Sequence, residues 1–527
     1  MAPTPNDPEE SGVLRPRALR AFDHHIERPH LAMDRTPSSL SSGRSTPVPE
    51  DAPPSAHYIS TVRKQVRAQV KQRIFYNIDY QPRLSHFDPN SDHRDFHGFF
   101  ILFWISLVIM VITTVLRNIK DTGYPLRVHV WSLLSANVFQ LALADMGMVA
   151  STAIIVPLHR AIRSSKGLLR WGIGGMVVQS IYQTVWLSFW VILPFKLDWT
   201  WTAQVFLTLH TLTILMKMHS YAFYNGHLSE TERRLSALDE PQAKVFPAAV
   251  HYPRSPVVAD TSNPANSEID SSDTDTDPKQ QVSKLRADLA MELTSPLGHV
   301  TYPQNLTWRN YVEFIFFPTL CYELEYPRTK DTCWIEVFIK AAAVFGCIFL
   351  LTLTSEEFIV PVLSDSAFRL RATPSHFERG LILAETISML LFPFMVTFLL
   401  VFLVIFEYVL GAFAEITRFA DRRFYSDWWN SCDWLEFLRK WNLPVHHFLR
   451  RHVYFSSLTR FSAPGAMAIT FLVSSIAHEL VMVCITKKWR GYGFFAMMLQ
   501  LPIVAIQRSK FVKGRKTFNI CALYVLV

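Results

Sequence analysis

Long apolar stretches recur along this chain, each close to the roughly 20 residues that a helix needs to cross a bilayer. They cover residues 99–115, 133–157, 173–194, 201–219, 337–353, 381–406, 466–485 and 492–506. Half of the chain is hydrophobic (50%), although long polar segments dilute this share. Because a bilayer interior offers exposed backbone groups no hydrogen-bond partners, stretches of this length must be helical. The sequence therefore predicts an all-α polytopic membrane protein with about eight to nine transmembrane helices.

Two polar segments divide the chain into parts. One runs from residue 1 to about 55 and is rich in Pro, Ser and charge; the other, from about 240 to 295, carries an acidic run at 260–277. Neither holds enough apolar residues to offset the entropy lost on folding. We therefore expect a cytosolic, largely disordered N-terminal region (1–90), front membrane helices (91–225), a disordered acidic linker (226–300) and rear membrane helices (301–527).

Charge and cysteine usage narrow the class further. The first apolar stretch begins near residue 99, too late for the apolar core of a cleavable signal peptide. The formal net charge is +8, but no dense basic tract interleaved with aromatics points to nucleic acid; basic residues before the first stretch instead predict a cytosolic N-terminus. The six cysteines form no Cys-x-x-Cys pair, which argues against a zinc site. A Cys321–Cys333 disulfide stays open, because spacing alone does not decide geometry.

A single histidine, His478, interrupts the apolar stretch 471–485. An ionisable side chain at membrane depth is costly, so it persists mainly where it faces a cavity or takes part in chemistry. His478 is therefore a candidate general base for a substrate that itself lies in the membrane. Ser474 lies one helical turn earlier on the same face, where it either lines a reaction chamber or simply packs as a small residue.

An aromatic run at 423–431 also contains Asp427 and Asn430. Trp and Tyr collect at headgroup depth, so an interfacial helix would explain the aromatic residues. It would not explain the two polar residues among them, which need hydrogen-bond partners in the protein or in a ligand. Composition alone leaves both interpretations open.

Residues 424–430, Phe-Tyr-Ser-Asp-Trp-Trp-Asn, resemble the FYxDWWN signature of sterol O-acyltransferases, within the membrane-bound O-acyltransferase superfamily. The spacing to His478 fits that family. Further similarity lies at 218–223, 317–320 and 326–329. Diacylglycerol acyltransferases share the signature, but residues 444–457 and 478–482 are most similar to the fungal sterol branch. The resemblance covers roughly residues 205–516.

The resemblance implies transfer of a fatty acyl group from acyl-CoA to the 3-hydroxyl of a sterol (ergosterol or a precursor), forming sterol esters for storage. It also implies a multi-pass protein of the endoplasmic reticulum membrane, usually a homo-oligomer, with acyl-CoA as co-substrate and neither metal nor cofactor. Its central pair places the base on His478 and the oxyanion donor on Asn430, roles that an imidazole and a carboxamide can fill. The residues expected to contact the substrates are Phe424, Tyr425, Asp427, Trp428, Trp429 and Ser474.

Other functions compete with this interpretation. A diacylglycerol O-acyltransferase of the same superfamily, or a non-enzymatic sterol-binding or transport protein, would also carry apolar helices. A metal enzyme is disfavoured, because no His-x-x-His-His occurs near the clustered His446, His447 and His452, and no second histidine completes a His-Glu-x-x-His motif after Glu479. Four more ionisable residues in apolar stretches are either functional or structural: Asp145, His210, Lys217 and Glu385.

The end of the chain departs from the family pattern. Relatives continue past the stretch corresponding to residues 514–517 through a further membrane helix, whereas this sequence ends at Val527 after a segment too short to span. We therefore expect a shortened C-terminus behind the catalytic helices.

Overall fold

The computed structural model describes residues 78, 80–85, 97–126, 132, 135–239, 286–296 and 298–509. Within these residues the chain is helical apart from its turns and three isolated β-bridges. The continuous helical segments long and apolar enough to cross a membrane are Gly98–Thr122, Val138–Ser164, Trp171–Lys196, Trp334–Ala372, His376–Ile416 and Ala463–Thr486. The prediction of an all-α polytopic membrane protein is therefore confirmed.

The predicted count of eight to nine spans is not confirmed. The stretch 201–219 forms the first half of α7 (Trp201–Asp239), where Gln204, His210 and Lys217 make the helix more polar than the six spans. The stretch 492–506 forms α18 (Tyr492–Gln507), which is apolar but has only 16 residues.

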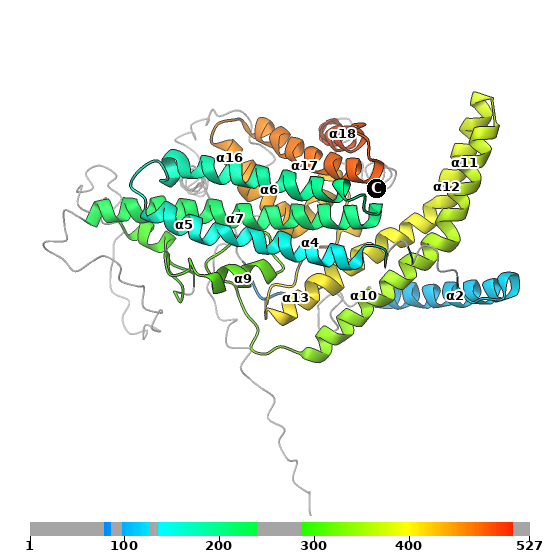
Figure 1. Ribbon diagram of the computed structural model, residues 1–527, viewed down its shortest axis with the longest axis horizontal. Helices are drawn as coiled ribbons and strands as arrows, with labels where there is room; N and C mark the ends of the chain where they lie inside the picture. The colour runs from blue at the N-terminus through cyan, green and yellow to red at the C-terminus, as the bar shows by residue number, and fades with distance from the viewer. Residues whose placement is uncertain are drawn as a thin grey trace, which may run out of the picture. The chain divides into compact units, whose positions relative to one another are not determined.

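The first front helix is α2 (His97–Thr122), whose Leu107 packs in a cluster with Cys347 and Leu400. The other front helices pack around α7. Next, α4 (Val138–Ser151) continues through the short η3 (Thr152–Ile154) into α5 (Ile155–Ser164), and η4 (Trp171–Gly175) leads into α6 (Met176–Lys196). Helices α4, α5 and α6 all contact α7 (Figure 1). Several polar side chains of α7 are therefore buried in protein, among them Gln204, Lys217 and Asn225.

A long helical hairpin follows α9 (Trp308–Phe316) (Figure 1). Its first arm is α10 (Trp334–Thr354), η5 (Ser355–Ile359) and α11 (Val360–Ala372). The second arm is α12 (His376–Phe402), η6 (Leu403–Val409) and α13 (Leu410–Ile416), and it packs along the first. Both η5 and η6 are π-helical turns, and η6 contains the buried Glu407. Such turns often mark functional positions in helices.

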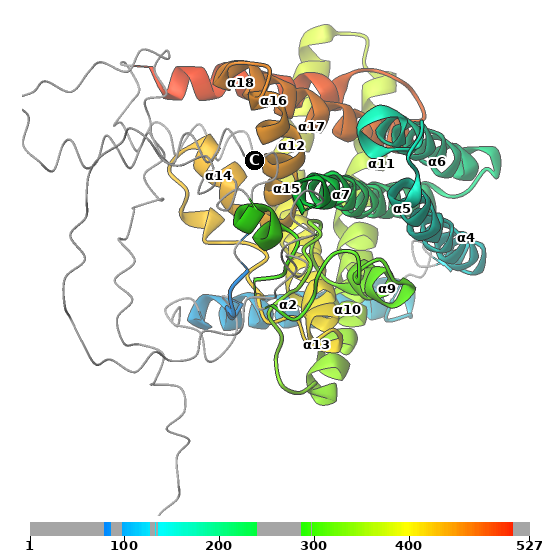
Figure 2. The same ribbon diagram turned by 90° about the vertical axis from the view of Figure 1, so that its left-hand side faces the viewer.

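The rear elements carry the candidate site. They are η7 (Trp428–Asn430), α14 (Trp434–Lys440), α15 (Leu443–Phe448), η8 (Leu449–Tyr454), α16 (Phe455–Leu458), α17 (Ala463–Thr486) and α18. Helix α17 packs along α18 and against α7 (Figure 2). Helix α14 joins this group because it contacts both η7 and α18.

Helical residues extend into the predicted linker at both of its ends, and packed residues precede the boundary predicted at 90. Helix α7 continues to Asp239, so residues 226–239 belong to a packed helix and not to the linker. Residues 286–292 are helical as well, so the linker predicted for 226–300 is ordered at both ends. At the N-terminal side, Tyr80 packs on the buried Tyr326, well before the predicted boundary at 90. Residues 1–77 and 240–285 lie outside the described part, as does the C-terminus from residue 510.

Of the three further segments that resemble the family, 218–223 lies on α7, and 317–320 contacts 326–329 through the rings of Phe317 and Tyr326, 4.7 Å apart between centroids. Tyr221 is fully buried, and its ring lies 4.7 Å from that of Tyr322 between centroids. Lys217 Nζ donates hydrogen bonds to the carbonyl oxygens of Phe314 (3.1 Å) and Phe317 (2.5 Å). A buried ammonium without such acceptors would be costly, so Lys217 binds the loop after α9 to α7.

Cys321 and Cys333 do not form the disulfide that the sequence left open. Both are free thiols; Cys321 is buried and Cys333 is exposed.

Candidate active site

His478 lies on α17, a 24-residue apolar helix that begins after Ser462 with Pro464 in its first turn. Its side chain is exposed on the helix surface. The ring Nδ1 lies 2.8 Å from the carbonyl oxygen of Ser474. A carbonyl only accepts hydrogen bonds, so neutral His478 carries its proton on Nδ1 and a lone pair on Nε2. The helix itself thus holds the imidazole in the form that can accept a proton.

Ser474 contributes its backbone to this arrangement. Its carbonyl oxygen receives the His478 hydrogen bond, and its side chain is half-buried. The neighbouring Ser475 is fully buried and donates to the carbonyl oxygen of Phe471 at 2.7 Å. The predicted position of Ser474 one turn before His478 is correct; its contact with a substrate stays a prediction.

Glu479 has a structural partner. Its carboxylate accepts hydrogen bonds from the backbone N–H groups of Gly491 (2.7 Å) and Phe494 (3.1 Å). These N–H groups lie at the start of α18, where the first turn of a helix lacks internal acceptors. Glu479 therefore connects α17 to α18 as an N-terminal cap.

The aromatic residues of the signature segment (residues 424–430) pack inside the protein. Phe424 and Tyr425 are buried, with 4% and 1% of their surface exposed. Trp428 is half-buried. Its ring contacts those of Phe398, Phe402, Phe437 and Trp441 at centroid distances of 5.8, 5.4, 6.0 and 5.1 Å. An internal aromatic cluster between α12 and α14 thus accounts for Trp428, in place of an interfacial belt.

Asp427 is held by the helix that follows it. Its Oδ1 lies 3.1 Å from Nζ of Lys440 and accepts a 2.9 Å hydrogen bond from the Ser426 hydroxyl. Partial burial raises the pKa of Asp427, but the hydrogen bonds from Lys440 and Ser426 outweigh it and lower the pKa below its ordinary value. The Ser426 N–H also donates to the Lys440 carbonyl at 2.8 Å. Asp427 therefore fixes the signature segment to α14.

Asn430 ends η7 with its side chain exposed. Its backbone N–H donates to the carbonyl oxygen of Asp427 at 3.1 Å. Among the described residues, no hydrogen bond engages its carboxamide, whose N–H groups remain available to a ligand. No hydrogen bond joins Asn430 to His478 in that part of the chain either. Their connection runs through α14 and α18, where the Trp434 N–H donates to Oε1 of Gln507 at 3.1 Å.

The other ionisable residues of the apolar stretches have protein partners. His210 Nδ1 lies 2.6 Å from Oδ1 of Asp145, and Glu385 pairs with Arg369 at 2.8 Å. Lys217 binds two carbonyl groups, as described above. These contacts support structural roles for all four.

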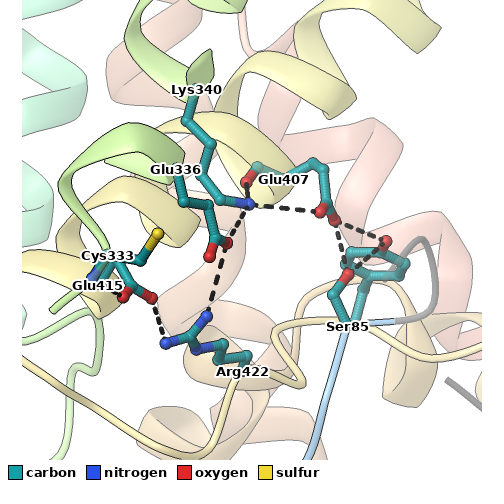
Figure 3. A network of polar contacts seen from close by, with 8 residues as sticks. Ser85, Cys333, Glu336, Lys340, Glu407, Glu415 and Arg422 are labelled. Atoms are coloured by element: carbon teal, nitrogen blue, oxygen red, sulfur yellow. Dashed lines mark hydrogen bonds and ion pairs between the residues drawn. The ribbon is translucent and has the colours of Figure 1, made fainter. Parts of the chain in front are cut away.

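The sequence missed a network of charged residues beside Tyr425 (Figure 3). Its members are Ser85, Cys333, Glu336, Lys340, Glu407, Glu415, Arg422 and Tyr425. The carboxylate of Glu407 accepts hydrogen bonds from the hydroxyls of Ser85 (2.6 Å) and Tyr425 (3.2 Å). Arg422 pairs with both Glu336 and Glu415. Glu407 directly follows the stretch 381–406, so an ionisable residue at the edge of an apolar run was the available signal.

No group of three metal-ligating side chains comes together in the described ranges. His452 Nε2 instead lies 2.8 Å from the hydroxyl of Ser220. The rings of His446 and His447 lie 6.2 Å apart between centroids.

Comparison with known proteins identifies the family. The membrane-bound O-acyltransferase (MBOAT) family profile matches residues 120–524. Probable sterol O-acyltransferase 2 of Schizosaccharomyces pombe is 38% identical over 452 residues, which cover 85% of this chain and 88% of that protein. Sterol O-acyltransferase 2 of Candida albicans is 34% identical (81% and 72% covered), and its namesake in Saccharomyces cerevisiae is 34% identical (80% and 63%). The chain therefore belongs to the membrane-bound O-acyltransferase family, with fungal sterol O-acyltransferases among its relatives.

Proposed function

We propose that this protein is an acyl-CoA-dependent sterol O-acyltransferase that forms sterol esters from acyl-CoA and ergosterol or a precursor. The observation that carries the proposal is the state of His478. Its Nδ1 is engaged by the Ser474 carbonyl at 2.8 Å, on the exposed face of an apolar helix, which leaves Nε2 as a base toward a substrate dissolved in the membrane. The relatives that align with at least four fifths of this chain are named sterol O-acyltransferases, which supports a sterol as the acyl acceptor.

The proposed reaction needs one base and one donor. As the sterol oxygen attacks the thioester carbonyl carbon, His478 Nε2 takes the hydroxyl proton. The Asn430 carboxamide donates to the oxyanion of the tetrahedral intermediate. When the carbon–sulfur bond breaks, the imidazolium returns its proton to the CoA thiolate. These steps balance protons and electrons without a metal or cofactor, and they require Asn430 and His478 to face one chamber.

A cluster of arginines supports acyl-CoA as the donor substrate. Burial lowers the pKa of Arg439, and repulsion from Arg508 and Arg450 lowers it further, with partial relief from Asp433. Arg439 lies on α14, which contacts α18, and Arg508 directly follows α18. Guanidinium groups gathered in one region favour a polyanion, and CoA carries several phosphate charges. The cluster lies on and around α14, which holds the signature segment.

The wider setting is also part of the proposal. Helices α7 and α18 complete a membrane domain of eight to nine spans, since α7 packs on three front helices and α17, and α18 packs along α17. An endoplasmic reticulum location and a homo-oligomeric state follow from the family resemblance.

The test is esterification by microsomes with labelled oleoyl-CoA and either ergosterol or diacylglycerol. Sterol ester should form from the parent enzyme and fall by at least about 100-fold in His478→Ala, the low end of general-base contributions. His376, an exposed histidine at the start of α12, provides the control His376→Ala, which should match the parent. Sterol ester formation that survives His478→Ala would refute the mechanism, and a product made only from diacylglycerol would refute the acceptor.

A further inference from the structure

A short segment before the first membrane helix, residues 80–85, lies against the chain that leads into the signature segment; we name it the N-terminal strap. The Arg83 N–H donates to the Ala420 carbonyl at 3.1 Å, and the Arg422 N–H donates to the Arg83 carbonyl at 2.8 Å. These bonds make a parallel β-bridge between Arg83 and Asp421. Residues far apart in sequence are thus paired through their backbones immediately before the signature.

Side chains strengthen the same contact. The Arg83 guanidinium donates two hydrogen bonds to the Asp421 carboxylate, from Nε to Oδ1 (2.9 Å) and from Nη2 to Oδ2 (2.5 Å). The Gln81 N–H adds a third at 3.3 Å. Asp421 is 4% exposed, so its charge depends on these partners in place of water. Bidentate pairing also fixes orientation, which a single contact would not.

The other end of the strap reaches the signature itself. Ser85 donates to Glu407 at 2.6 Å, and Glu407 also accepts from the Tyr425 hydroxyl (Figure 3). Lys340 balances Glu407 from α10, with Nζ 3.7 Å from its Oε1. The strap therefore contacts the chain on both sides of Arg422: at Asp421 directly, and at Tyr425 both through Glu407 and directly, with the hydroxyls of Ser85 and Tyr425 3.3 Å apart.

We propose that the N-terminal strap is a positioning element of the acyltransferase site, with Arg83 and Ser85 as positioning residues that set the placement of Asn430 and its neighbours. The proposal rests on the proposed function. Arg83 acts through Asp421 and the backbone of Arg422. A misplacement of about 1 Å at the reacting groups can cost about 100-fold in rate, so a strap of this kind affects turnover before it affects folding.

The test uses the full-length protein, both in microsomes and purified in detergent. Arg83→Ala should lower kcat per folded enzyme by about 10- to 100-fold with smaller changes in KM. Arg83→Lys keeps the positive charge but loses the bidentate guanidinium, so its kcat should lie between those of Arg83→Ala and the parent. Because the two residues act through one contact, Arg83→Ala with Asp421→Asn should be no worse than the more affected single variant. The matched control is Arg163→Ala, which removes the bidentate pair of Arg163 with Glu232 (2.9 and 2.8 Å) between α5 and α7 and should leave kcat unchanged.

A readout independent of activity is hydrogen–deuterium exchange in the peptide covering 419–431. Arg83→Ala should speed its exchange, whereas Arg163→Ala should not. A kcat per folded enzyme equal to the parent's, or unchanged exchange in 419–431, would overturn the strap, even if the yield of folded protein fell. Faster exchange in a protein that makes no sterol ester would leave the strap standing as a conformational device and refute the proposed function.

Discussion

The Glu479 carboxylate accepts a 2.7 Å hydrogen bond from the backbone N–H of Gly491, so the residue directly after the candidate base holds the start of the next helix. Gly491 has a φ of +78°, a conformation that side chains rarely adopt, and this turn presents its N–H to α17. Two neighbouring residues thus point in opposite directions: His478, the candidate base, faces outward, and Glu479 faces inward and packs against α18.

Replacing Glu479 should therefore affect stability first. Glu479→Gln removes the charge that complements the N-terminus of α18, and we expect a lower unfolding midpoint in detergent. Activity per folded enzyme should fall less than in His478→Ala. Glu378→Gln, at an exposed position in the first turn of α12, is the control. An unchanged midpoint in Glu479→Gln would show that the cap contributes nothing.

Asn430→Ala should affect activity and leave stability unchanged, the reverse of Glu479→Gln. Its carboxamide is exposed, so the unfolding midpoint should match the parent's, while kcat should fall by about 100- to 1,000-fold on loss of an oxyanion donor. Asn430→Asp, which replaces the donor with a carboxylate, should be at least as inactive. Steady-state kinetics with oleoyl-CoA measure both. An active Asn430→Asp would exclude the oxyanion role.

The pairing of Asp427 with Lys440 predicts a pH dependence of stability. Since folding lowers the pKa of Asp427, the ionised form stabilises the fold above the unfolded pKa of about 3.9, and this stabilisation disappears as the pH falls through the folded value. The side chains are 38% and 24% exposed, so the gain stays below about 1 kcal/mol. Asp427→Asn should melt slightly earlier than the parent at pH 7, and the two curves should converge once the pH has fallen below the folded pKa of Asp427. A gap that persists at low pH would contradict this pairing.

The buried pair of Arg451 and Glu323 predicts a large stability effect. Arg451 is 1% exposed, and its Nη1 donates to Glu323 Oε1 at 2.8 Å and to the Tyr322 carbonyl at 3.1 Å. Arg451→Met would leave a buried carboxylate unpaired, at a cost of about 3–5 kcal/mol. We expect little folded protein by size-exclusion chromatography, with partial recovery on adding Glu323→Gln. Equal yields for the single and double variants would argue against the pair as the cause.

Hydropathy located the apolar spans because each contains enough apolar residues by itself. It did not give the full extent of α7, since Lys217 and Asn225 are polar residues buried by distant parts of the chain. Asn225, for example, accepts a 2.7 Å hydrogen bond from Asn305. Local patterns do not contain such partners. The same reason explains why α7 continues past the boundary predicted at residue 225, because packing against other helices extends α7 to Asp239.

The site shows the same division. His478 could be singled out because an ionisable residue in an apolar helix is anomalous without any reference to its neighbours. The function of Glu479 could not, because its partners are backbone groups beyond the next turn. Asp427 could be flagged as needing a partner, but nothing in the aromatic run identified Lys440. The N-terminal strap could not be predicted, because neither Arg83 nor Asp421 is unusual in its local sequence.

The strap also sets an order of events during biosynthesis. Arg83 and Asp421 are 338 residues apart, so the strap leaves the ribosome long before its partner exists. At roughly 5–20 residues per second, the wait is on the order of 17–70 seconds. During that time the front helices can enter the membrane, but Asp421 and the signature cannot yet take their places. The signature segment therefore reaches its final position late, after most of the membrane domain has been synthesised.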